Sequence, residues 1–140
     1  MAIRFNFEKS FTFNNRRKTK NWIKEIIRLE GKNCGDISYD FVCDQKELEI
    51  NKEFLSHDFY TDIITFDYVE NDTISGDIFI SVDRVKENAK EFNSTFDNEI
   101  HRVIIHGVLH LLGYKDHTKK DNKIMRQKED EALKLFYEDV

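Results

Sequence analysis

Four short segments of the chain carry the residue pattern of β-strands. Residues 3–7 and 63–69 alternate apolar and polar positions, and residues 37–43 are rich in β-branched and aromatic side chains. A turn at Asn71 and Asp72 leads into the fourth segment, residues 74–82. Because little more than this turn separates 63–69 from 74–82, we expect these two strands to form a hairpin.

Five further segments have apolar positions at helical spacing. They cover about residues 19–29, 46–55, 83–92, 97–112 and 119–137. Glycines at 31 and 113 lie just after two of them and are typical helix stops. The segment 97–112 is apolar almost all round, which predicts a buried helix.

These elements indicate one α+β domain that covers residues 1–140. The chain has no proline, no linker-like segment and no internal repeat. We expect a small mixed sheet of about four strands packed with about five helices, with the candidate metal site on the buried helix.

Composition excludes several classes of protein. Hydrophobic residues make up 39% and charged residues 35% of the chain, and the charges are spread along its length, which argues against a membrane span and against disorder. The N-terminus lacks the continuous apolar stretch of a secretory signal. We therefore predict a cytoplasmic protein without a membrane partner. Cys34 and Cys43 lack the CxxC spacing of metal ligands and are expected to be free thiols.

A net charge of −5 argues against a protein that coats nucleic acid with its whole surface. Basic residues do gather in two places, and on charge alone each is most simply a solvated helix end. The two clusters are Arg16, Arg17, Lys18 and Lys20, and Lys115, Lys119, Lys120 and Lys123.

The segment 106–117, HGVLHLLGYKDH, carries the chemistry. His106 and His110 are four residues apart and so project from one face of a helix, where two imidazoles can bind one zinc ion. A histidine in an apolar helix is more often a core residue, and an HxxxH pair is common by chance. The continuation favours a metal, because Gly113 permits a sharp turn and Asp116 lies six residues after His110, the offset of the third ligand in metzincins.

Gly107 stands where zinc peptidases carry the glutamate that acts as general base. The pattern therefore favours a metal-dependent hydrolase other than a standard peptidase.

These residues resemble the YbeY endoribonucleases, whose hallmark is similar to HGxLHLxGYDH. Asn51 and the segment 61–66 (TDIITF) resemble the family's N…TDVLSF, and residues 76–80 (GDIFI) resemble its GDIxI strand. Asn88 and Ala89, and later Met125 and Glu129, also fit. The resemblance covers about residues 45–135, and the histidine motif is its specific part.

The resemblance implies a zinc-dependent endoribonuclease that acts on single-stranded RNA, with one Zn²⁺ per chain. The expected substrate is ribosomal RNA, at the 3′ end of 16S rRNA, with a role in ribosome quality control and with the small subunit or ribosomal proteins as partners. Zinc-bound water would be the nucleophile, and no protein residue stands out as a catalytic base.

Two departures from the family pattern matter. The third ligand is normally a histidine, and here Asp116 holds that position, with His117 as the alternative if Lys115 is an insertion. The family's arginine after Asn51 aligns with Leu55, and Arg102 is a weak substitute for it. This leaves two other hypotheses open: a zinc hydrolase of another class, or a non-catalytic RNA-binding protein of the ribosome with a structural zinc.

The remaining candidates have plainer interpretations. His57 is expected in a solvated loop, and His101 on the surface, because it lies off the face of His106. The period-two aromatic residues are expected to be core rather than a platform for RNA bases; these are Phe5, Phe7, Phe11 and Phe13.

Overall fold

The structure is a computed structural model that describes residues 2–8, 13, 15–55 and 61–138. Strands and helices follow one another in the mixed order expected of an α+β fold. In chain order they are β1 (Ile3–Phe7), α1 (Arg16–Leu29), β2 (Asn33–Val42), α2 (Asp44–Leu55), β3 (Ile63–Asp67), β4 (Thr73–Ser81), α3 (Val82–Glu91), α4 (Phe96–Leu111) and α5 (Lys119–Glu138). The predicted α+β class is confirmed, and most boundaries lie within three residues of the prediction.

The four strands form one mixed sheet in the order β1-β2-β4-β3. The predicted hairpin is present, since β3 pairs antiparallel with β4 and Thr65 lies opposite Ile78. The pairs β1–β2 and β2–β4 are parallel, with Tyr39 of β2 between Phe5 and Ile78. The antiparallel edge strand β3 is the strand nearest the candidate site.

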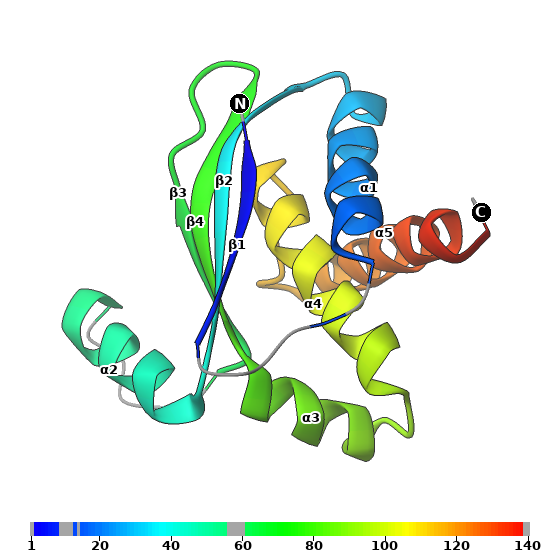
Figure 1. Cartoon of the computed structure of the whole chain (residues 1–140). Helices are drawn as coiled ribbons and strands as arrows, with labels where there is room; N and C mark the ends of the chain where they lie inside the picture. Colours follow the sequence, from blue (N-terminus) through cyan, green and yellow to red (C-terminus); the bar gives the residue numbers. More distant parts are fainter. Residues whose placement is uncertain (1, 9–12, 14, 56–60, 139–140) are drawn as a thin grey trace.

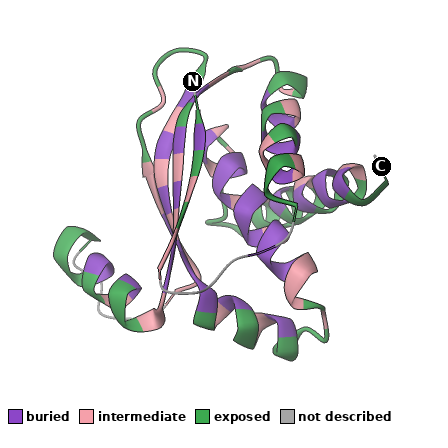
Figure 2. Cartoon of the chain, viewed as in Figure 1, coloured by how far each residue is buried: buried purple, intermediate pink, exposed green. Residues whose placement is uncertain are grey.

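One face of the sheet carries the core. Along β4 every second residue from Ile74 to Ile80 is buried, and the residues between them are partly exposed. Helices α1, α4 and α5 lie together on the buried side of the sheet (Figure 1), and Figure 2 shows the purple buried positions gathered between these helices and the strands. Helix α4 contacts β3, β4, α1, α3 and α5, so its burial follows from having neighbours on nearly every side.

The helix α4 approaches the sheet closely at Gly107. A Cβ atom at this position would lie 2.9 Å from Ile78 Cδ1 and 3.1 Å from Ile63 Cδ1. The position therefore faces the sheet, and any side chain larger than that of glycine would crowd Ile78 and Ile63. The close packing of α4 on the sheet therefore explains why glycine stands where zinc peptidases have glutamate.

The prediction that His101 lies on the surface is wrong. Its side chain is fully buried, with Nδ1 2.7 Å from the Asp97 carbonyl oxygen and Nε2 3.1 Å from Thr19 Oγ1. Its ring also packs on Trp22 and Phe136. The sequence pattern of α4 alone could not show that α1 and α5 cover a second face of this helix.

Of the period-two aromatic residues, Phe13 is buried in the core, and Phe5 and Phe7 are partly buried and pack against it. Phe5 and Phe7 of β1 pack with Phe13 and Phe41 at ring-centroid distances of 5.1 to 5.8 Å, whereas Phe11 lies outside the described residues. Cys34 and Cys43 are free thiols. None of the helices in the described ranges is both long enough and apolar enough to cross a membrane.

Candidate metal centre

Helix α4 places the two histidines of the motif side by side. His106 and His110 lie one turn apart on its surface with ring centroids 4.7 Å apart, and both side chains are partly exposed. The helix then ends in a turn in which Gly113 has a φ of 105° and its N–H donates to the His110 carbonyl at 3.0 Å. This left-handed conformation favours glycine and reverses the chain.

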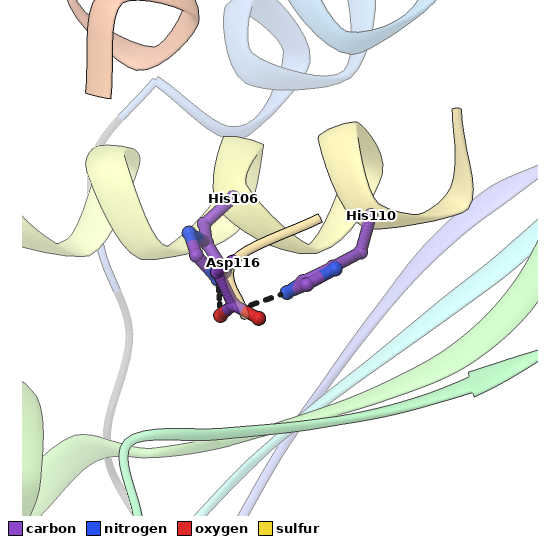
Figure 3. Close-up of side chains that lie close together, drawn as sticks. All are labelled: His106, His110 and Asp116. Atoms are coloured by element: carbon purple, nitrogen blue, oxygen red, sulfur yellow. Dashed lines mark hydrogen bonds and ion pairs between the residues drawn. The ribbon is translucent and has the colours of Figure 1, made fainter. Parts of the chain in front are cut away.

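The reversed chain returns Asp116 to the histidines (Figure 3). Asp116 Oδ2 lies 3.3 Å from His110 Nε2 and 3.6 Å from His106 Nε2. Two ligands bound at about 2.0–2.1 Å to one tetrahedral ion lie about 3.3–3.4 Å apart. The donor set of two imidazoles and a carboxylate, all within 4.8 Å of one another, therefore suits a divalent metal ion such as zinc.

His117, the alternative third ligand, is exposed and is not a member of this group of side chains. It directly follows Asp116, so the backbone that brings the Asp116 carboxylate to the histidines leaves the neighbouring side chain in solvent. The structure thus brings together the residues that the unshifted alignment selects.

Glu129 of α5 fixes the orientation of His106. Its Oε2 lies 2.6 Å from His106 Nδ1, and because a carboxylate can only accept, Nδ1 carries the proton and Nε2 is left free to face Asp116. Burial alone would lower the pKa of His106, but the hydrogen bond and charge of Glu129 outweigh it and raise that pKa. Such a partner makes the imidazole a stronger ligand.

Glu129 is in turn held by Arg102 of α4. Arg102 Nη1 donates to Glu129 Oε1 at 2.9 Å, and its Nη2 donates to Asp130 Oδ1 at 2.8 Å. The side chain of Arg102 is only 16% exposed. Arg102, the weak substitute for the family arginine, is therefore committed to two carboxylates and serves to position Glu129.

The three candidate ligands line a cleft of about 610 Å³. Its walls come from β3, α3, α4 and α5, and they are largely polar and charged. The lining residues are Thr61, Asp62, Ile63, Thr65, Asp67, Asn88, Phe92, Glu99, Arg102, Val103, His106, His110, Leu111, Asp116, Arg126 and Glu129.

Two carboxyl groups near the first residue of β3 have raised pKa values. Asp62 lies in the cleft wall and accepts a hydrogen bond from Asn88 Nδ2 at 3.1 Å. Burial raises the pKa of Asp62, and His106 and Asn88 only partly offset this. Behind it, the fully buried Glu47 of α2 accepts from the Thr61 N–H at 3.3 Å, and burial raises its pKa to about 8.

Sequence reasoning did not assign the roles of Glu129, Asp62 and Glu47. For Glu129 a signal was present, because this acidic residue lies on the buried stripe of α5 that also contains Met125 and Leu133. A carboxylate at such a position needs a partner. Asp62 lies in the segment 61–66 that resembles the family pattern, but no local pattern marks Glu47, and only the tertiary structure brings the two close. His57 lies outside the described residues.

The chain is similar to known proteins over most of its length. The family model described as endoribonuclease YbeY matches residues 4–137. An endoribonuclease YbeY from Phocaeicola vulgatus is 52% identical over 121 residues, which is 86% of this chain and 88% of that protein. One from Flavobacterium johnsoniae is 47% identical over 135 residues, 96% of this chain and 97% of that protein.

A solved structure shows the same fold. The solution structure of a protein from Thermotoga maritima superposes with a TM-score of 0.72 at 30% sequence identity, and the match covers 99% of this chain and 91% of that one.

Proposed function

Because the chain belongs to the endoribonuclease YbeY family, we propose that it is a metal-dependent endoribonuclease that hydrolyses single-stranded RNA. The observation that carries the proposal is the convergence of His106, His110 and Asp116 in an open, polar cleft. Two helical imidazoles and one returning carboxylate leave a tetrahedral ion one position for water or substrate, as catalytic zinc sites do.

We propose that the metal is zinc, one ion per chain, with Asp116 rather than His117 as the third ligand. Support comes from the separations of 3.3 and 3.6 Å between Asp116 Oδ2 and the histidine nitrogens. When bound, zinc supplies a Lewis acid that polarises a phosphoryl oxygen and lowers the pKa of water to about 7.

The chain's own residues prepare this chemistry. Glu129 holds the proton on His106 Nδ1, and Arg102 holds Glu129 in place. Asp116 carries a negative charge that a neutral histidine would not bring. The ion therefore retains a smaller net positive charge than it would with three neutral imidazoles, which makes the remaining cations of the cleft more important for an anionic substrate.

The biological substrate that we propose is ribosomal RNA. The family resemblance implies maturation of the 3′ end of 16S rRNA and ribosome quality control, with the small ribosomal subunit or its proteins as partners. A cytoplasmic location follows from that role. Peptide hydrolysis is disfavoured, because position 107 faces Ile78 and Ile63 and cannot offer a general base to the cleft.

The direct test is cleavage of a labelled single-stranded RNA with and without a chelator. We expect cleavage by the freshly purified protein, loss of cleavage with the chelator, and recovery when zinc is restored. A His106→Ala/His110→Ala double variant should be folded, free of bound zinc and inactive.

A matched control is Lys86→Ala, since this exposed residue of α3 lies outside the cleft lining. The control should cleave as the wild type does. RNA cleavage that persists in the chelated protein or in the double variant would refute the proposal. If removal of zinc unfolds the protein, the non-catalytic alternative with a structural metal is favoured instead.

A further inference from the structure

The lining of the cleft carries more acidic than basic side chains, which is unfavourable for binding a negatively charged RNA strand. Among the described residues its lining contains five carboxyl groups and two guanidinium groups. Even a divalent ion in the site leaves few positive charges for the phosphates of a bound strand. Single-stranded RNA is held largely through such phosphate contacts, so the cleft needs a cation that is free to make one.

The two guanidinium groups differ in how many of their hydrogen-bond donors are already used by carboxylates. Arg102 is 16% exposed and donates to two carboxylates at 2.9 and 2.8 Å. Arg126 of α5 is 58% exposed and forms a loose ion pair, with Nη1 3.7 Å from Glu129 Oε1. Arg126 therefore keeps most of its donors available while standing within one helical turn of the residue that orients His106.

Arg126 is also the last of a row of three cations on α5. Lys119, Lys123 and Arg126 are spaced by four and three residues, which places them on one side of α5, and all three are exposed. The next residue in this row, Asp130, is paired with Arg102 at 2.8 Å. The row thus leads from the start of α5, just after the Asp116 turn, to the cleft without an uncompensated negative charge.

Building on the proposed function, we propose that Arg126 is the residue that binds an RNA phosphate beside the metal group, and that Lys123 and Lys119 extend this contact along α5 as a track for the RNA backbone. A guanidinium can bind a phosphate through two parallel hydrogen bonds, whereas the two lysines contribute point charges. The row lies at the rim of the buried stripe of α5, so it can hold the strand without disturbing the core.

The test measures binding of zinc-loaded protein to a labelled, single-stranded 2′-O-methyl RNA oligonucleotide over a range of salt concentrations. Arg126→Gln should weaken binding about 10-fold. It should also reduce the slope of log affinity against log salt by about 0.7, the value for one lost phosphate contact on a single strand. Arg126→Lys should keep the salt slope but recover only part of the affinity, because it lacks the paired donors.

Arg4→Gln is the matched control, since this exposed residue of β1 lies on the opposite face of the sheet, outside the cleft. Lys123→Gln and Lys119→Gln should each lower the salt slope by a similar amount with a smaller loss of affinity. If Arg126→Gln behaves as Arg4→Gln does, the proposal is wrong.

Zinc affinity separates this proposal from a structural role. Arg126→Gln should bind zinc as tightly as the wild type, and a parallel loss of zinc would mean that Arg126 acts by positioning Glu129, which overturns the proposal. The result is also distinct from that for the proposed function. Wild-type protein that binds RNA through Arg126 but never cleaves it would refute the endoribonuclease and leave the phosphate track intact.

Discussion

At the residue scale the site depends on side chains that do not touch the metal position. Glu129 is 6% exposed and sits between His106 and Arg102, with contacts of 2.6 and 2.9 Å. The contacts with Arg102 and His106 offset part of the free-energy cost of burying this carboxylate. What it provides is a fixed tautomer and direction for His106, and this makes a pair of helical histidines into a preorganised ligand set.

We predict that Glu129→Gln lowers zinc affinity by about 10- to 100-fold. Glutamine keeps the size of the side chain and can still accept from Nδ1, but it removes the negative charge that strengthens His106 as a ligand and leaves Arg102 with one carboxylate. Competition with a chromophoric chelator measures the change. Glu131→Gln, an exposed neighbour on the same helix, is the control and should match the wild type. Equal zinc affinity in the two variants would show that Glu129 plays no such part.

At the element scale the site is assembled from helices and a hairpin that are distant in sequence. Helix α4 supplies both histidines, α5 supplies Glu129, and the segment just before β3 supplies Thr61 and Asp62. Helix α2 reaches this segment through the buried Glu47, which accepts from the Thr61 N–H at 3.3 Å. Its second oxygen, Oε2, has no hydrogen-bond partner among the described residues. A carboxyl group so placed is more stable when protonated.

This placement predicts a pH dependence of stability. The pKa of Glu47 rises from 4.5 to about 8 on folding, so its contribution to stability is fully present below about pH 4.5 and is lost as the pH rises through about 8. The loss is on the order of a few kcal/mol. Glu47→Gln, which is neutral at every pH, should unfold at a higher urea concentration than the wild type at about pH 8 and at a similar one near pH 5.

Glu49→Gln is the control for this comparison, because Glu49 is exposed on the same helix. It should follow the wild-type pH dependence. The account of Glu47 fails if the difference between Glu47→Gln and the wild type stays constant from about pH 5 to about pH 8.

At the scale of the whole molecule, the helices and strands were more predictable from the sequence than the tertiary contacts between them. The period-two and helical patterns predicted β1, the β3–β4 hairpin and the buried α4 because each pattern reflects one element's own exposure. The strand order β1-β2-β4-β3 is not encoded in any single segment, since it depends on which strands the helices bring together.

The same limit explains the site. His106, His110, Gly113 and Asp116 lie within one short segment, and their spacing was enough to predict a common face and a returning third side chain. His101 was placed wrongly because α1 and α5 bury a second face of α4. The availability of Arg126 could not be foreseen either, because it follows from Arg102 being bound by Glu129 and Asp130.

The effect of charge on RNA binding also depends on where the fold places the charged residues. A net charge of −5 argued against a general nucleic-acid coat, and it still does. The cations that matter for RNA are the few that one side of α5 presents at the cleft, next to a site for a divalent ion. A local arrangement of this kind allows an acidic protein to bind a polyanion.

The most direct test of the central claim, that His106, His110 and Asp116 together hold one catalytic ion, is the zinc affinity of Asp116→Asn compared with that of His117→Gln. We predict one tightly bound zinc per chain in the wild type and in His117→Gln, and a loss of affinity by orders of magnitude in Asp116→Asn, because only Asp116 faces both histidines. Wild-type affinity in Asp116→Asn, or its loss in His117→Gln, would contradict the account.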